Sequence, residues 1–356
     1  MDIRKNTYKH FFSLNKKSIA GCILILFLFG CSSSQNELFF NPENFLVWPQ
    51  PPEKPRIRYL GTISTENDLK KKHSFNFDLG ELFFGRKEIG VLISPYAIAI
   101  DQDYKLYVTD TSAGIVHIFN LPKREYSQFG KISKKESLQK PVGITVIGNW
   151  VYVVDSMLHK VFIFDNKGKY LFSFGDDKLI RPSGITHSKD KKEVFVADTA
   201  GHTIIAFTSG GKFITKIGSR GIEPGLFNFP TQLCSDNNGR IYVSDTLNYR
   251  IQVFSNQWVP QIIFGKQGDR PGNFAHPCGI ATDSYDNIYV ADRQFENIQI
   301  FNSQGQILMA FGHEGTQPGQ FWLPSGICTD DHNRIYVADS FNKRIQVFQL
   351  LEQAGK

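Results

Sequence analysis

Six aspartates recur along the chain at nearly constant spacing, each directly after a run of β-branched and aromatic residues. They are Asp110, Asp155, Asp198, Asp245, Asp292 and Asp339, separated by 45, 43, 47, 47 and 47 residues. A ring of carboxylates could bind a metal or act in acid–base catalysis. The same groups could instead accept N–H bonds from the residues that follow and brace a loop. Because every repeat has this acid, we favour the structural interpretation.

Arginines follow two of these aspartates at a distance of five residues. Arg250 follows Asp245, and Arg344 follows Asp339. A guanidinium at this spacing can reach the carboxylate across a short loop and hold it with charge-assisted hydrogen bonds. We therefore expect a hairpin brace in these two repeats rather than a catalytic pair.

The elements that position these residues form a sixfold repeat, clearest in RIYVADSFNKRIQVF at 334–348. This stretch predicts a strand, a turn and a second strand, and related copies begin near residues 106, 151, 194, 241 and 288. Each repeat opens with a proline and a short apolar strand, and all but the last close with a strand ending in Phe-Gly or Ile-Gly. Four short strands in every repeat, with no room for a helix, are typical of a propeller blade.

We therefore predict an all-β fold, a six-bladed β-propeller of four-stranded antiparallel blades. The sixth repeat stops after its third strand at Phe348, and RIRYLGTI at 56–63 is a candidate for the missing strand. Pairing outside Arg344–Phe348, this N-terminal strand would close the ring and cover an open sheet edge. The predicted propeller spans 56–350, with the closing strand at 56–64, a docked insertion at 65–94 that includes a short helix around Leu79–Phe84, and the blades at 95–350.

The later repeats resemble a known family. IYVSD with NYRIQVF, IYVAD with NKRIQVF, and connectors such as GHEGTQPGQFWLP are similar to the motif of NHL-repeat six-bladed β-propellers. The resemblance is strongest in repeats four to six and weakest in the first. It implies the same propeller fold that the strand pattern predicts.

The resemblance also offers a test for one enzymatic activity. In the peptide α-amidating lyase, which is built on NHL-like blades, the resemblance places zinc-binding histidines directly after the blade-opening prolines. The matching residues here are Tyr96, Val142, Ser183, Thr231, Cys278 and Ser325. None is a histidine, so this activity is not carried over. We predict no catalytic residue, no side-chain metal site and no cofactor.

Five cysteines, Cys22, Cys31, Cys234, Cys278 and Cys328, match no zinc or CxxC spacing. Cys234 and Cys328 occupy the same place in repeats four and six, too far apart for a disulfide, and are expected to be packed thiols. Cys278 lies nearer an expected channel mouth, but no partner base is evident.

Connectors between blades and the loops from second to third strands emerge on one side of the ring, here called the loop face. It comprises connectors such as 218–230, 265–277 and 312–324 and loops such as 246–249, 293–296 and 340–343. Arginine with exposed aromatics is typical of protein interfaces. The candidate binding residues are Arg220, Tyr249, Lys266, Arg270, Arg293, Phe295, Phe341 and Lys343.

The N-terminus has the features of a bacterial lipoprotein signal peptide at 1–30. A basic segment precedes a short apolar run, Ile19–Phe29, and LFGC at 28–31 resembles the lipobox. The run is too short for a transmembrane helix. By this resemblance Cys31 becomes the first mature residue, carries acyl groups and attaches the chain to a membrane. Ser32 then favours the outer membrane of a Gram-negative cell, and 31–55 is a flexible Ser/Pro-rich tether.

The net charge of +6 owes much to that leader, where five basic residues against one acid contribute 5 − 1 = 4. The remaining charge of about 6 − 4 = +2 gives no electrostatic case for nucleic acid. The favoured function is therefore a lipid-anchored, non-catalytic scaffold at the cell envelope that binds a protein partner of unknown identity. An enzyme, or a protein that binds a small ligand or metal at the channel mouth, is the alternative. An RNA-binding NHL module is the least favoured.

Overall fold

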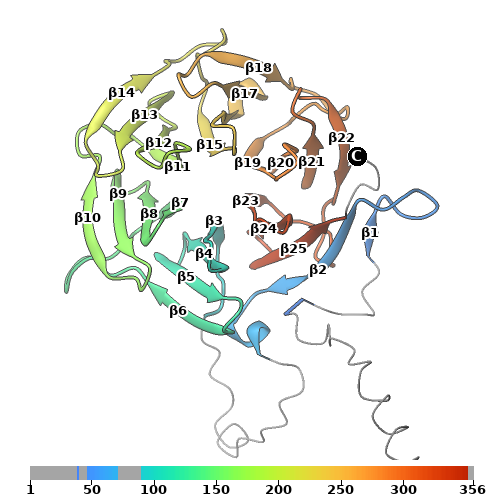
Figure 1. Ribbon diagram of the computed structural model, residues 1–356, viewed down its shortest axis with the longest axis horizontal. Helices are drawn as coiled ribbons and strands as arrows, with labels where there is room; N and C mark the ends of the chain where they lie inside the picture. The colour runs from blue at the N-terminus through green and yellow to red at the C-terminus, as the bar shows by residue number, and fades with distance from the viewer. Residues whose placement is uncertain (1–37, 40–45, 71–89, 352–356) are drawn as a thin grey trace, which may run out of the picture. The chain divides into compact units, whose positions relative to one another are not determined.

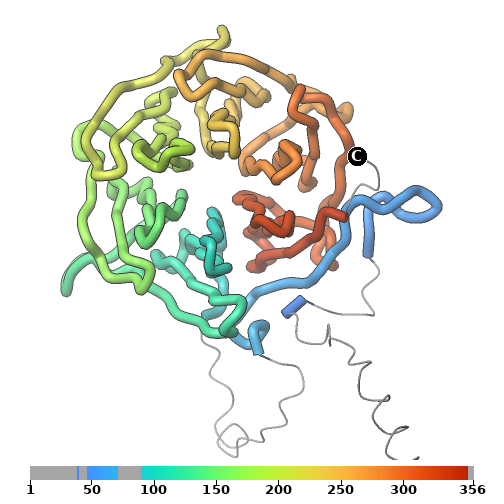
Figure 2. Tube along the Cα trace, viewed as in Figure 1, coloured from blue at the N-terminus to red at the C-terminus, as the bar shows by residue number. Residues whose placement is uncertain are grey.

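The computed structural model describes residues 38–39, 46–70 and 90–351, and nearly all of the secondary structure is β-sheet. Six antiparallel sheets stand around a central axis, as Figures 1 and 2 show for the unit Asn41–Lys356. The prediction of a six-bladed β-propeller with four-stranded blades is confirmed.

The first three blades follow one another along the chain, each running from its innermost to its outermost strand. Blade 1 consists of β3 (Pro95–Ile100), β4 (Lys105–Asp110), β5 (Ile115–Asn120) and β6 (Glu125–Phe129). Blade 2 consists of β7 (Pro141–Ile147), β8 (Trp150–Asp155), β9 (Lys160–Asp165) and β10 (Tyr170–Phe174). Blade 3 consists of β11 (Pro182–His187), β12 (Glu193–Asp198), β13 (Thr203–Thr208) and β14 (Phe213–Ile217).

The last three blades repeat this order, except that blade 6 takes strands from the N-terminal side. Blade 4 consists of β15 (Pro230–Ser235), β16 (Ile241–Asp245), β17 (Arg250–Phe254) and β18 (Pro260–Phe264), with a 3₁₀ turn η3 (Thr246–Asn248). Blade 5 consists of β19 (Pro277–Thr282), β20 (Ile288–Asp292), β21 (Asn297–Phe301) and β22 (Ile307–Phe311). Blade 6 consists of β23 (Pro324–Thr329), β24 (Arg334–Asp339), β25 (Arg344–Leu350), β2 (Ile57–Ile63) and β1 (Val47–Trp48).

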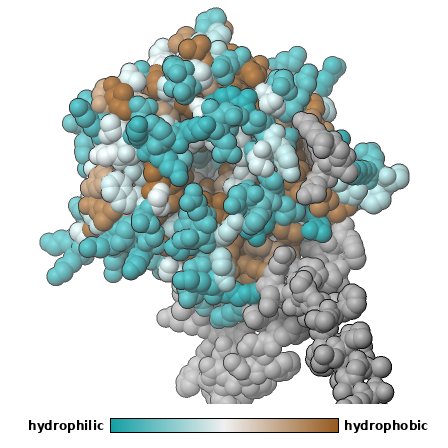
Figure 3. Space-filling view, in the orientation of Figure 1, coloured by the Kyte–Doolittle hydropathy of each residue, from teal (hydrophilic) through white to brown (hydrophobic). Residues whose placement is uncertain are grey.

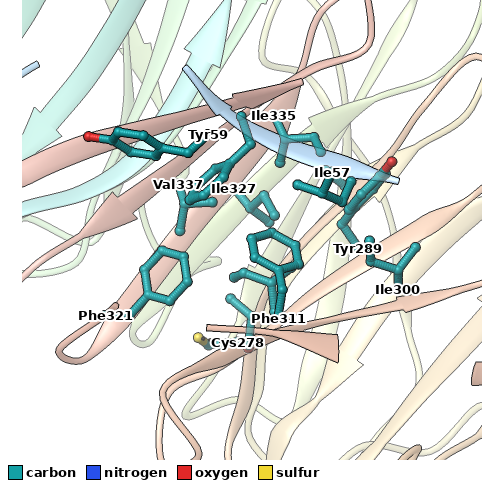
Figure 4. Close-up of a cluster of buried hydrophobic side chains, with 14 residues drawn as sticks. Ile57, Tyr59, Cys278, Tyr289, Ile300, Phe311, Phe321, Ile327, Ile335 and Val337 are labelled. Atoms are coloured by element: carbon teal, nitrogen blue, oxygen red, sulfur yellow. Dashed lines mark hydrogen bonds between the residues drawn. The ribbon is translucent and has the colours of Figure 1, made fainter. Parts of the chain in front are cut away.

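The second strand of each blade is almost entirely buried, whereas outer strands such as β14 are largely exposed. Blades pack face to face, so the middle strands are covered on both sides and read as nearly continuous apolar runs. Figure 4 shows one such core between blades 5 and 6, where Phe311 and Ile300 meet Val337 and Ile335. The blade core therefore lies between sheets and away from the central axis.

Closure of the ring depends on the N-terminal strand, as predicted. β2 pairs antiparallel with β25, from Ile57 opposite Leu350 to Ile63 opposite Ile345. Ile57 and Tyr59 enter the core between blades 5 and 6 (Figure 4). The strand thus supplies both the missing edge and part of the apolar core of blade 6.

The prediction of a flexible tether over 31–55 is wrong for Val47–Trp48. These residues form β1, which pairs with Ile57 and Arg58 of β2 as a fifth strand of blade 6. The Trp48 ring packs against Phe311 and Phe348, at centroid distances of 5.5 and 5.8 Å. Apolar contact therefore fixes this short stretch despite the prolines that follow it.

The predicted insertion after the closing strand begins with a 3₁₀ helix, η2 (Glu66–Leu69). Thr65 and Asp68 form a reciprocal capping box, and Leu69 is fully buried. Residues 71–89, which include the predicted helix around Leu79–Phe84, lie outside the described residues, as do the signal peptide and Cys31. Among the helices that the structure describes, none is both long and apolar enough to cross a bilayer.

In four blades the innermost strand approaches that of the next blade so closely that only glycine fits near its start. A Cβ on Gly279 would collide with the carbonyl oxygen of Ser325 in the next blade, and Gly143, Gly184 and Gly326 meet their neighbours in the same way. This contact explains the Pro-x-Gly motif of four repeats. We expect Gly279→Ala to lower the free energy of unfolding by about 1–3 kcal/mol, because the next strand must shift.

Chemical denaturation provides the measurement, and Gly210→Ala is the matched control. Gly210 lies in a turn, and an added Cβ would find its nearest neighbour at an ordinary 3.8 Å. Equal stability losses in the two variants would refute the close-packing explanation.

Candidate functional site

The six repeated aspartates are structural braces. In blade 6 the buried Asp339 carboxylate accepts the backbone N–H of Trp322 at 2.7 Å, Arg344 Nε at 2.7 Å and Gln346 Nε2 at 3.0 Å. Asp245 has the corresponding contacts in blade 4, including Arg250 Nε at 2.8 Å. The predicted ion pairs are confirmed, and the protein's own donors occupy these carboxylates.

Blades without the arginine use main-chain donors instead. Asp292 accepts N–H bonds from Ala275 and His276 in the connector before blade 5, and from Gln294 and Phe295 in the loop between β20 and β21. Each brace therefore ties the connector to the loop between the second and third strands. Within the described ranges, no group of three or more His, Cys, Asp or Glu side chains is placed to hold a metal.

Blade 1 departs from this pattern in a way that sequence reasoning missed. His117 is buried, with Nε2 3.4 Å from Asp110 Oδ2 and Nδ1 2.9 Å from the Tyr126 hydroxyl. Burial raises the pKa of Asp110, but His117 and three backbone N–H groups outweigh it, and the net pKa is lowered. His117 stands seven residues after its aspartate, at the position where blades 4, 5 and 6 have glutamine. Aligning the repeats at this position could have revealed it.

The cysteines are not placed for nucleophilic chemistry. Cys278 is buried, and its thiol donates to the carbonyl oxygens of Ala291 and Pro324 at 3.3 and 3.4 Å. Burial raises its pKa to about 12, so the thiol stays protonated at neutral pH. Cys234 and Cys328 are free thiols on the central channel, and burial raises their pKa values as well.

A cavity of about 240 Å³ follows the central axis and is lined by the innermost strand of every blade. The lining begins at the third or fourth residue of each strand, for example Ala97 and Gly279, and excludes the layer that contains Tyr96 and Cys278. Since these strands start at the loop face, the cavity lies toward the opposite side of the ring. Its volume is below the roughly 300–1,000 Å³ of sites for drug-sized ligands.

The predicted loop-face residues differ in exposure. Those exposed to solvent are Arg220, Lys266, Arg270, Phe341 and Lys343, and those half-buried are Tyr249, Arg293 and Phe295. Tyr249 packs against the core between blades 4 and 5. Phe341 is 54% exposed and contacts Trp322, with ring centroids 4.1 Å apart. Phe341 is thus the most exposed aromatic side chain among these predicted positions.

Sequence reasoning missed most of the apolar side chains on this face. Two positions are equivalent from blade to blade: two residues before the opening proline, and two residues after the brace aspartate. Exposed apolar side chains at these positions form what we call the apolar ring: Ile93, Met157, Ile180, Leu247, Trp322 and Phe341, which are 37–61% exposed. Every blade except the fifth contributes at least one. Aligning the six repeats at these two positions would have found them.

One face of the molecule appears in Figure 3, where hydrophilic residues surround a central hollow and apolar residues form separate patches. The profile of the NHL repeat matches residues 227–254 and 321–348. The chain carries NHL repeats. The two matched segments run from a buried connector phenylalanine, Phe227 or Phe321, to the end of the third strand in blades 4 and 6.

A curated relative of this NHL propeller is Protein brain tumor of Drosophila melanogaster. It is 27% identical over 153 residues, which cover 42% of this chain. The chain spans only 14% of the length of that protein.

Solved structures share the propeller fold at low sequence identity. An auxiliary nutrient binding protein from Bacteroides ovatus superposes with a TM-score of 0.58 at 11% identity, over 74% of this chain and 71% of that one. Catalytically inactive virginiamycin B lyase from Staphylococcus aureus with quinupristin superposes with a TM-score of 0.55 at 16% identity. The match covers 76% of this chain and 86% of the lyase. At these identities the similarity shows the fold alone.

Proposed function

We propose that this NHL propeller is a lipid-anchored, non-catalytic scaffold at the cell envelope, and that it binds a protein partner through its loop face. The apolar ring is the observation that carries the proposal. Six large apolar side chains remain exposed at equivalent positions of five blades, whereas the repeated aspartates between them serve as braces. Apolar anchors among arginines are typical of protein interfaces.

The scaffold that presents this ring is rigid. Main-chain hydrogen bonds join the loop to the connector in each blade, such as Phe341 to Trp322 and Leu247 to Asn228. The brace aspartates hold the same two segments through their carboxylates. A surface fixed in this way loses little conformational freedom on binding, which favours affinity.

A small-ligand site in the channel is the second candidate, supported by the 240 Å³ cavity. The lyase and the nutrient binding protein named above are precedents only for the fold. The volume suits a small solute better than a drug-sized ligand.

Crosslinking in intact cells, followed by mass spectrometry, tests the scaffold proposal. We expect one recurrent protein partner with the full-length chain. Replacing Ile180 or Phe341 with Asp should lower its recovery at least about tenfold, because a charge would then have to be desolvated in the interface. Tyr285→Asp is the control, since Tyr285 is exposed in a turn between innermost and second strands, on the opposite face. The absence of a recurrent partner would refute the proposal.

The anchoring part of the proposal depends on Cys31. Two or more acyl chains bind a membrane firmly, at roughly 0.8 kcal/mol for each buried methylene. We therefore expect the full-length chain to sediment with the membrane fraction and Cys31→Ala to reduce this sedimentation strongly. If the variant and the unaltered chain sediment equally, lipid anchoring at Cys31 is wrong.

A further inference from the structure

Arg293 occupies a position where every other blade has a small hydroxyl residue. The residues directly after the brace aspartates are Thr111, Ser156, Thr199, Thr246 and Ser340. In blades 3, 4 and 6 this hydroxyl donates to the carbonyl oxygen of the next blade's opening proline, as Thr246 does to Pro277 at 2.9 Å. In blade 5 the Cys278 thiol donates the corresponding hydrogen bond, to the carbonyl oxygen of Pro324 in blade 6. Arg293 is therefore not needed to join the blades.

Arg293 is half-buried as a residue, yet within the described part of the chain no hydrogen bond or ion pair engages its guanidinium. The nearest acid in sequence, Asp292, is already occupied by four backbone N–H groups. A second polar group beside it is also unused: Nδ1 of His276 is buried without a hydrogen-bond partner. Burial and the charge of Arg293 both lower the pKa of His276, which is thus neutral at physiological pH.

Tyr96 of blade 1 lies near both Arg293 and Arg181, the residue before blade 3, whose guanidinium packs over the Phe229 ring at 5.9 Å. Tyr96 is the largest residue of the layer that separates the cavity from the loop face, and it packs against the cores between blades 1 and 2 and between blades 2 and 3. Burial raises the pKa of its hydroxyl, Cys278 of blade 5 adds to this, and Arg293 and Arg181 oppose it. The hydroxyl thus stays protonated as a donor. Blades 1, 3 and 5 alternate around the ring, and both guanidinium groups lie close enough to Tyr96 to act on the pKa of its hydroxyl.

We propose that the centre of the loop face binds a carboxylate, with Arg293 as its principal ligand and Arg181 and the Tyr96 hydroxyl as further donors. A guanidinium can hold a carboxylate through two parallel hydrogen bonds, and partial burial strengthens the attraction. Because the apolar ring surrounds this point, the carboxylate belongs to the protein partner. The inference therefore rests on the proposed function and adds the chemistry of the partner: an acidic group flanked by apolar residues.

Fluorescence anisotropy of labelled peptides tests this site on the full-length chain. The probe is Leu-Gly-Glu-Gly-Leu with an amidated C-terminus, compared with the same peptide carrying Gln and with the Gln peptide bearing a free C-terminal carboxylate. We expect a carboxylate-bearing peptide to bind at least about tenfold tighter than the amidated Gln peptide, as loss of a charge-assisted pair predicts. Tighter binding of the Glu peptide would identify the partner's carboxylate as a side chain. Tighter binding of the Gln peptide with the free C-terminus would identify it as a chain terminus.

Arg293→Thr should abolish this preference, and Lys135→Gln should preserve it. Threonine stands at the equivalent place in blades 1, 3 and 4, so an unchanged melting temperature will show that the variant is folded. Lys135 is exposed in the connector after blade 1 and controls for the loss of one positive charge. Equal binding of all three peptides, no binding of any, or a preference retained by Arg293→Thr would overturn the inference. A recurrent partner in cells without a carboxylate preference would leave the scaffold proposal intact.

Discussion

Deletion of residues 56–64 is expected to lower the melting temperature of the propeller by about 10 °C or more. The deletion removes the whole of β2 and, with it, three side chains that are at most 5% exposed: Ile57, Tyr59 and Ile63. Each buried side chain of this size contributes about 2–5 kcal/mol. The deletion also leaves β25 as an unpaired edge and removes the partner of β1.

Point variants separate the packing contribution from loss of the strand itself. Ile57→Ala should reproduce part of the effect, about 2–5 kcal/mol, because Ile57 lies in the core between blades 5 and 6. Arg58→Ala is the control: Arg58 is exposed on the same strand and should change stability by no more than roughly 0.5 kcal/mol. A melting temperature unaffected by the deletion would contradict ring closure by β2.

Asp339→Ala is expected to destabilise the protein by about 3–5 kcal/mol, the cost of leaving a buried charge and its hydrogen-bond partners unsatisfied. The variant leaves Arg344 Nε and the N–H of Trp322 without this acceptor, and Gln346 Nε2 keeps only its bond to the carbonyl oxygen of Gln320. Asp339→Asn keeps one acceptor oxygen but not the charge. Its stability should therefore fall between that of the unaltered protein and that of Asp339→Ala.

Urea denaturation measures this difference, and Asp269→Ala provides the control because Asp269 is an exposed connector residue. Little loss of stability in Asp339→Ala would mean that the carboxylate is not a brace. Its presence in all six blades would then need a functional explanation.

The sequence predicted those parts of the structure that local spacing determines. Asp245 and Arg250 are five residues apart across one tight loop, so their ion pair follows from the register of a single hairpin. The closing strand followed from counting, because the sixth repeat lacked a strand and residues 56–63 had the right pattern. In both cases the repeat itself supplied the information that an isolated motif lacks.

What sequence reasoning missed depends on contacts between distant segments. Val47–Trp48 is too short and too close to prolines to indicate a strand, and its order comes from packing on Phe311 and Phe348. Exposure of Met157 and Ile180 depends on how loops and connectors of one blade are held together. Arg293 was among the candidate binding residues, but its relation to Tyr96 exists only once the ring has closed.

Photo-crosslinking from single positions tests the central claim, that the loop face binds the partner, most directly. A photoreactive amino acid would replace Met157 on the loop face or Tyr285 on the opposite face, two side chains that are each 61% exposed. We expect position 157 in the full-length chain to capture the partner in cells and position 285 not to capture it. Capture from position 285 alone, or equally from both, would contradict it.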